Sequence, residues 1–174
     1  MSAKWIPALV FAAAGVVSTG NVMADSGVCN GNPLLQSTTD RQVSYLDLGE
    51  KGKSPGDQRI GTASVVDPDG NKVGETFWQV TMLFPAKDSD AFTVSGSQYF
   101  HFPEGKIYLE VLINQYGAAF SDADKLHPKS PADAAPTKML VLGGTEKFEG
   151  VTGTMTLERS GETLAYNFDL NCPG

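Results

Sequence analysis

The chain has 174 residues, of which 41% are hydrophobic and 19% charged, and its formal net charge is −7. That length and composition suit one globular domain with one core. The excess of acidic side chains argues against binding to nucleic acid or to an anionic membrane surface, because both attract basic proteins.

Residues 1–24 have the pattern of a secretory signal peptide. Lys4 precedes an apolar run from Trp5 to Val17, and small residues at 22–24 precede a cleavage site. The run is too short to span a bilayer comfortably, although an uncleaved anchor is the alternative. We therefore expect a secreted or periplasmic protein that keeps no membrane segment after cleavage. Residues 25–42 would then form an N-terminal arm.

Two cysteines, Cys29 and Cys172, lie near opposite ends of the predicted mature chain. In an oxidising compartment an even pair is most simply a disulfide, which would fasten the N-terminal arm to the last strand. Neither cysteine has a CxxC partner or a basic neighbour. We therefore expect a structural bond with no redox or catalytic role.

The sequence between the cysteines has the pattern of an all-β protein. Short alternating or apolar runs are separated by turn signals such as Asp69-Gly70 and Ser160-Gly161, and no segment has a convincing amphipathic helix pattern. The predicted strands are Val43–Leu48, Ile60–Val66, Val73–Phe84, Ala91–Phe102, Lys106–Asn114, Met139–Leu142, Thr152–Leu157 and Thr163–Leu170. Eight strands with short links predict a closed eight-stranded antiparallel up-and-down barrel over residues 43–172, because closure removes unpaired sheet edges. An open sandwich is the alternative.

Residues 115–137 are the exception to this spacing. The run is rich in Ala, Asp, Pro and Ser, and loops of this length without structure of their own are usually functional lids or mobile segments. Both interpretations stay open.

A stretch near the end of the chain resembles a family signature. Lys138–Glu158 reads KMLVLGGTEKFEGVTGTMTLE, with Gly143-Gly144 after an apolar strand, Phe148 in the connection, and Gly150 and Gly153 where the chain turns back. This order is similar to the GG(T/S)GxFxGxxGxxxL signature of allene oxide cyclases and to a related stretch of dirigent proteins. Glycines at such positions permit positive φ or close backbone approach, so we assign these residues a structural role.

A second stretch, Tyr45–Val80, is similar to the opening of both families. It has an aromatic-to-acidic strand, a Gly- and Ser-rich loop, a GDxxG step and a hairpin, in that order. Together the two stretches imply the small eight-stranded antiparallel barrel that allene oxide cyclases and dirigent proteins share. The resemblance also implies a homo-oligomer, since many such barrels are trimers.

The chain follows the cyclase pattern more closely than the dirigent pattern. Dirigent proteins that direct phenoxyl coupling carry an acidic residue and an arginine where this chain has Lys147 and Thr152. Glu149 continues the FEGxxG pattern of the cyclases. The cavity asparagine of the cyclases, however, aligns with Gly49.

The resemblance implies that Asp47 is the catalytic residue and faces the barrel cavity. Burial there would raise the pKa of its carboxyl group, which could then donate a proton or stabilise positive charge on a reacting olefin. The alternative places Asp47 in solvent beside other charged residues. Four aromatic residues are candidates for the ligand cavity, with plain core as their alternative: Trp78, Phe92, Phe100 and Tyr108.

Metal and cofactor patterns do not appear in the sequence. His101 and His127 are isolated from other ligands at metal spacing, and residues 67–71 fit a turn better than a calcium loop. Two functions therefore remain. The barrel is an isomerase or cyclase that holds an apolar, unsaturated small molecule and favours one ring closure, or it is a non-catalytic carrier of a hydrophobic ligand.

Overall fold

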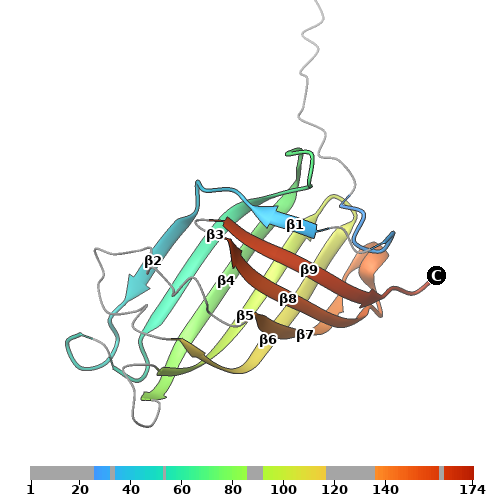
Figure 1. Cartoon of the computed structure of the whole chain (residues 1–174). Helices are drawn as coiled ribbons and strands as arrows, with labels where there is room; N and C mark the ends of the chain where they lie inside the picture. Colours follow the sequence, from blue (N-terminus) through green and yellow to red (C-terminus); the bar gives the residue numbers. More distant parts are fainter. Residues whose placement is uncertain (1–25, 32–33, 53, 86–91, 117–135, 161–162) are drawn as a thin grey trace, which may run out of the picture.

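Segments in which apolar and polar residues alternate form nine β-strands in the described part of the computed structural model (Figure 1). The structure describes residues 26–31, 34–52, 54–85, 92–116, 136–160 and 163–174. The strands are β1 (Leu34–Ser37), β2 (Gln42–Leu46), β3 (Gln58–Val66), β4 (Lys72–Pro85), β5 (Phe92–Phe102), β6 (Gly105–Tyr116), β7 (Thr137–Gly144), β8 (Thr152–Ser160) and β9 (Thr163–Asn171). The expected signal segment and most of the expected 115–137 loop lie outside the described residues.

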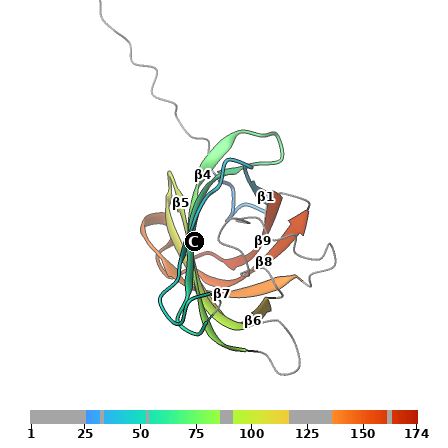
Figure 2. The same ribbon diagram turned by 90° about the vertical axis from the view of Figure 1, so that its left-hand side faces the viewer.

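Eight of these strands close into an antiparallel barrel. From β3 to β9 each strand pairs with the next one in the chain, and β1 completes the ring by pairing with both β9 and β3. Leu35 lies opposite Tyr166 of β9, and Ser37 lies opposite Val65 of β3. Figure 2 looks along the barrel and shows the strands arranged around it. The predicted closed eight-stranded antiparallel barrel is confirmed.

The strand that closes the ring differs from the expected one. The predicted first strand corresponds to β2, which pairs only with β3 and is additional to the ring. Closure comes from β1, in the segment where the sequence indicates an arm. The reason is length: four residues with the pattern LLQS are too few to show a period of two against the residues around them.

Aromatic rings fill the half of the barrel next to β1 and β9. Phe100 packs edge-to-face against Tyr166, with ring centroids 4.9 Å apart, and against Phe168 at 5.0 Å. Phe102 contacts Phe148 at 5.9 Å, so the Phe148 ring covers one end of this core from the 3-10 turn Glu146–Phe148. Edge-to-face pairs of this kind add stability beyond the apolar area that they bury.

The Gly143-Gly144 pair lets the chain turn tightly over this end. Gly143 has a φ of 148°, a conformation that suits glycine. A Cβ at Gly144 would lie 2.6 Å from the carbonyl oxygen of Lys106 and 2.5 Å from the Cβ of Phe148. The backbone of β7 therefore approaches both β6 and the Phe148 turn more closely than any side chain allows.

The two ends of the chain are joined beside the core. Cys29 and Cys172 form a disulfide with their Cα atoms 5.8 Å apart, as predicted. Ser26 reinforces this attachment, because its backbone N–H and its hydroxyl both donate to Oε1 of Glu104, at 2.8 and 2.7 Å. The described part of the chain contains no helix with the length and apolar character needed to cross a membrane.

Replacing Gly144 by valine should destabilise the barrel. The new Cβ would clash with backbone atoms on two sides, so we expect a loss of about 1–3 kcal/mol in the free energy of unfolding. Leu142→Ala is the control, because Leu142 lies on the same strand and is 60% exposed. It should change stability by about 0.5 kcal/mol or less. Chemical denaturation measures both, and a wild-type midpoint for Gly144→Val would contradict this account.

Removing the disulfide should lower stability without changing the fold. The bond closes a sequence separation of 143 residues, which in the chain-entropy model contributes about 4–5 kcal/mol. The double variant Cys29→Ser, Cys172→Ser should therefore melt at a lower temperature and keep the β-sheet circular dichroism spectrum. A melting temperature equal to that of the oxidised wild type would show that the bond does not constrain the chain.

Candidate binding site in the barrel interior

Polar side chains lie together inside the otherwise apolar barrel. Ser37, Thr76, Gln98 and Tyr166 come from four strands, β1, β4, β5 and β9. Each occupies an inward position, and their exposed fractions are 2%, 0%, 4% and 0%. Thr76 lies opposite the core residue Phe100, and Gln98 alternates with Phe100 along β5. We call these four residues together with Arg41 the interior polar cluster.

Hydrogen bonds fix part of this cluster. The side-chain amide of Gln98 donates to the hydroxyl of Thr76 at 2.8 Å, and Thr76 donates in turn to the carbonyl oxygen of Tyr99 at 3.1 Å. The backbone N–H of Leu164 donates to the hydroxyl of Ser37 at 3.1 Å. Because the Ser37 oxygen already accepts a bond, its own proton is available to donate.

The hydroxyl of Tyr166 differs from these groups. It is buried and makes no hydrogen bond within normal distance and angle among the described residues, although the side chains of Ser37 and Gln98 lie close enough to lower its pKa by hydrogen bonding. Burial raises the pKa of Tyr166 to about 12, and the nearby Ser37, Arg41 and Gln98 offset part of that rise. The phenol is therefore neutral at physiological pH and carries a proton that it can donate.

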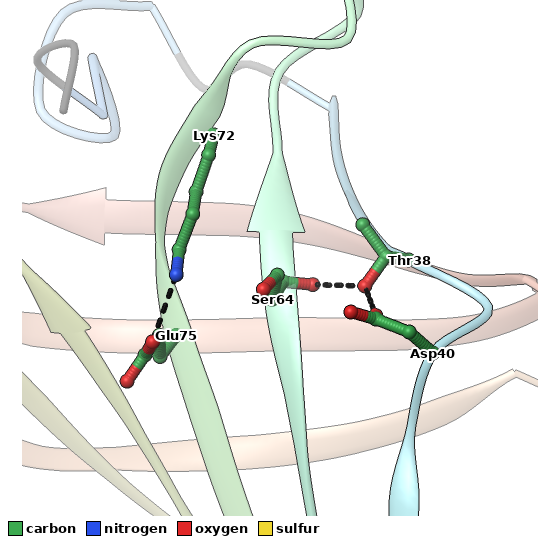
Figure 3. Close-up of polar contacts among 5 residues, drawn as sticks. All are labelled: Thr38, Asp40, Ser64, Lys72 and Glu75. Carbon is green, nitrogen blue, oxygen red and sulfur yellow. Dashed lines mark hydrogen bonds and ion pairs between the residues drawn. The ribbon is translucent and has the colours of Figure 1, made fainter. Parts of the chain in front are cut away.

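Arg41 reaches this cluster from the corner between β1 and β2. The N–H of Thr38 donates to the carbonyl oxygen of Ser64 at 3.0 Å, which ties the corner to β3. The hydroxyl of Thr38 contacts both that oxygen and the carboxylate of Asp40 (Figure 3). Arg41 follows directly, and its Nε atom is buried. Its positive charge lowers the pKa of Tyr166.

Trp78 borders the same cluster on the inward side of β4. Its strand partners are Gln98 on β5 and Gly61 on β3. A Cβ at Gly61 would lie 2.5 Å from Cε2 of Trp78, so the indole lies directly over the Gly61 backbone. The residue is half-buried.

A second small core lies further along the barrel. Met82 and Val94 are buried there, with Val80 and Tyr45 packed against them. The apolar interior thus lies on both sides of the interior polar cluster, since the large aromatic core occupies the other half.

Asp57 holds the loop beside this second core. Its carboxylate accepts hydrogen bonds from the Tyr45 hydroxyl at 2.5 Å, the Ser54 N–H at 2.7 Å and the Leu48 N–H at 3.0 Å. Burial raises the pKa of Asp57, but these hydrogen bonds outweigh burial and hold it below its ordinary value. Burial and the Asp57 contact raise the pKa of Tyr45 above its usual 10. All of these partners come from the chain itself, so the role of Asp57 is structural.

Asp47 lies on the surface. Strand β2 ends at Leu46, so the alternation that would turn Asp47 inward stops one residue before it. Asp47 is exposed, and its carboxylate accepts the backbone N–H of Gly52 at 3.1 Å. Its catalytic role stays a prediction.

The expected cavity aromatics have different positions. Phe100 is buried inside the barrel and Trp78 is half-buried on the inward side. Tyr108 lies on the outer face of β6, because Ile107 and Leu109 face inward, and its ring packs against Tyr99 at 5.9 Å. The side chain of Phe92 lies outside the described part of the structure.

The remaining residues named from the sequence lie at turns or on the surface. Gly150 and Gly153 have φ values of 79° and 133°, in the turn and strand after Phe148. His101 is exposed on β5, and His127 lies outside the described residues. Within the residues described, no three His, Cys, Asp or Glu side chains are placed to hold a metal ion.

Sequence patterns could have indicated Tyr166 but not its neighbours. Leu164, Tyr166 and Phe168 share one face of a predicted strand, and an inward tyrosine needs a partner for its hydroxyl. Arg41 gave no such signal, because it stands beside Asp40 in a polar segment that resembles surface.

An open groove of about 360 Å³ lies on the outer face of β2–β5. Among its lining residues, Ile60, Phe77 and Tyr99 are exposed apolar or aromatic side chains. No residue of the interior polar cluster lines it, although Gly61 and Trp78, which border the cluster, do.

Several solved structures share this fold. No family model and no curated protein sequence matches the chain. A structure named "Pyocyanin demethylase" has a TM-score of 0.58 and 20% identity, with 79% of this chain and 98% of that chain covered. A nonspecific heme-binding cyclase that catalyses a cycloaddition in neoabyssomicin biosynthesis has a TM-score of 0.55 and 15% identity, over 80% of this chain and 62% of that one.

A third similar structure is the Diels Alderase AbmU from Streptomyces koyangensis. Its TM-score is 0.53 and its identity 17%, over 80% of this chain and 60% of that one. The chain thus spans about three fifths of the length of these two cyclising proteins. The resemblance to the allene oxide cyclase and dirigent type of barrel is confirmed at the level of the fold.

Replacing Asp57 by asparagine should weaken the protein in a pH-dependent way. Because the folded-state pKa is lowered, the stability that Asp57 contributes is present above the unfolded value of about 4 and is lost as pH falls through the folded value. We expect Asp57→Asn to lose about 2–3 kcal/mol at pH 7 and to show a smaller further loss below pH 4. Asp169→Asn, which removes an exposed aspartate from β9, is the control. Denaturation curves from pH 2 to pH 7 measure the difference, and parallel curves for wild type and Asp57→Asn would contradict it.

Proposed function

We propose that the barrel binds a mostly apolar small molecule in its interior and guides the cyclisation or isomerisation of that molecule. The observation that carries this proposal is the interior polar cluster, which lies within apolar walls and contains the buried Tyr166 hydroxyl. Small-molecule sites typically combine a hydrophobic lining with a few polar groups that fix the orientation of the ligand.

The chemistry of the interior supports an effect on conformation more than strong acid–base catalysis. The inward groups near Tyr166 are a hydroxyl, an amide and a guanidinium, and none of them is a strong acid or base at neutral pH. Such groups orient a ligand and stabilise charge at an oxygen atom. Holding a flexible molecule in one reactive conformation can itself accelerate ring closure considerably.

The structural comparisons support the same class of function. Three barrels of this fold are named as a demethylase, a cyclase and a Diels Alderase, and all three names refer to reactions of small molecules. The alternative is a carrier that binds a hydrophobic ligand without changing it. The exposed position of Asp47 favours this alternative, because the expected inward carboxylate is at the surface.

Secretion and assembly are part of the proposal. The Cys29–Cys172 disulfide supports an oxidising compartment such as the periplasm or the cell exterior. A homo-oligomer, with a trimer as the expected form, stays a prediction.

A larger side chain in the barrel interior should weaken ligand binding. Val80 is half-buried, packs on Met82 and Val94 inside the barrel, and is followed by the outward residue Thr81. We expect Val80→Trp to weaken binding of the apolar fluorophore 8-anilinonaphthalene-1-sulfonate at least tenfold, because the new ring occupies interior space. Thr81→Trp adds the same ring to the outer face and should bind as wild type does. Fluorescence titration gives the affinities, and thermal melts show that both variants fold. Equal affinities for the two variants would place the ligand outside the barrel.

Chromatography of the ligand after incubation shows whether the protein converts it, as an enzyme would, or only binds it, as a carrier would. A cyclised or isomerised product has the mass of its substrate but a different retention time on a chiral column. Incubation of a bound unsaturated ligand with the protein should yield such a product faster than incubation without protein, and should favour one stereoisomer. Recovery of the ligand unchanged would contradict catalysis and support the carrier function.

A further inference from the structure

The groove on the outer face of β2–β5 combines aromatic side chains with neutral polar ones. Phe77 and Tyr99 are each 38% exposed, and together with Ile60 they form the apolar part of the groove. The amides of Gln42 and Gln79 also line it. Exposed apolar side chains bordered by polar residues are typical of interaction sites and ligand-binding grooves.

Strand register places these residues in two neighbouring rows. One row crosses four strands as successive direct partners: Gln42, Thr62, Phe77 and Tyr99. Ile60 and Gln79 are direct partners in the next row. Directly opposed residues have Cβ atoms about 4.5–5.5 Å apart. The Phe77 ring therefore has the Thr62 hydroxyl beside it across the strands and the Gln79 amide beside it along β4.

The ring of Tyr99 is supported from the side away from Phe77. It packs edge-to-face against Tyr108, with ring centroids 5.9 Å apart, and Tyr108 is the direct partner of Tyr99 on β6. A ring that is already held in place loses little conformational freedom when a ligand contacts it. The aromatic part of the groove is therefore partly organised before binding.

Charge and shape limit the kind of ligand that fits. Among the described residues, those that line the groove carry no charged side chain, although the whole chain has a net charge of −7. An ionic ligand would find no opposite charge there to replace its hydration. The groove is open, and its volume of about 360 Å³ is near the lower end for small-molecule sites. It therefore suits an uncharged ligand that lies along the surface.

A neutral sugar matches both components of the groove. Amide and hydroxyl groups donate and accept hydrogen bonds, as sugar hydroxyls do. The flat face of a β-linked pyranose presents C–H groups of weakly positive character, which are attracted to the negative face of an aromatic ring. A purely apolar ligand would instead cover the Gln42 and Gln79 amides without offering them a hydrogen bond, which costs free energy.

We propose that this outer groove is a carbohydrate-binding site in which Phe77 and Tyr99 contact the flat face of a neutral pyranose. The amides of Gln42 and Gln79 bind the hydroxyls at the edge of that ring. The ligand class is an uncharged β-linked glycan, such as a chain of glucose or N-acetylglucosamine. The site lies on the outside of the barrel, so it goes beyond the proposed interior function and does not require it.

Isothermal titration calorimetry with cellohexaose, a neutral β-linked glucose oligomer, tests the aromatic contacts. The protein should bind this sugar, and Phe77→Ala and Tyr99→Ala should each weaken binding about 10-fold because a ring contact is lost. Leu83→Ala is the matched control, because Leu83 lies on the same strand as Phe77, is also 38% exposed and is not among the residues that line the groove. It should bind cellohexaose as wild type does, and thermal melts check that all variants fold.

A second pair of variants distinguishes a sugar from an apolar ligand. Gln79→Met keeps the length of the side chain but removes the amide, so it should weaken cellohexaose binding about 3- to 10-fold. Gln58→Met makes the same change on β3 outside the groove and should leave binding unchanged. Binding that is equal or stronger in Gln79→Met would show that the amide does not hold a hydroxyl and would overturn the inference.

Three further results would also overturn the carbohydrate site. The first is that neither cellohexaose nor chitohexaose binds at millimolar concentration. The second is that Phe77→Ala binds cellohexaose as tightly as wild type, which would place the sugar elsewhere. The third is a sugar-free oligomer that Phe77→Ala dissociates in sedimentation velocity, because the groove would then be a contact between copies of the chain. Interior binding is decided separately by the comparison of Val80→Trp with Thr81→Trp.

Discussion

The short strand β1 is the constraint on which the barrel depends. Without it, β9 would leave a row of backbone groups unpaired, β3 would pair with β2 alone on that side, and the sheet would stay open. The same four residues deliver Leu35 to the aromatic core and Ser37 to the interior polar cluster. The Cys29–Cys172 bond precedes β1 and the Thr38–Ser64 contact follows it (Figure 3). Closure, core and site are therefore anchored by one segment that is tied at both ends.

Most of the fold was predictable because its long strands alternate clearly. Residues 107, 109 and 111 face inward on β6, as their period of two predicts. The strand that closes the ring was not predictable, because its pairing depends on residues more than a hundred positions away, such as Tyr166 opposite Leu35. The local period of two indicates which face of a strand is buried, but it does not indicate which other strand pairs with that strand.

The site was less predictable than the fold, for related reasons. Asp47 followed the inward phase of β2, but that strand ends at Leu46 and the loop beyond it turns the side chain outward. The aromatic character of Tyr108 suggests a place in the cavity, although the inward positions of its neighbours Ile107 and Leu109 put it on the outer face. Arg41 enters the interior through a corner whose geometry is set by Thr38 contacts across to β3. Contacts between residues that are distant in the sequence cannot be recognised from a short-range pattern.

Two buried oxygen groups show how a structural role differs from a role in binding. The carboxylate of Asp57 is satisfied entirely by the chain, and burial without those partners would raise its pKa. The residue Tyr166 is equally buried, but its hydroxyl makes no hydrogen bond of the same quality, and burial raises its pKa to about 12. Its ring contact with Phe100 would be available to a phenylalanine as well, so packing does not account for the hydroxyl.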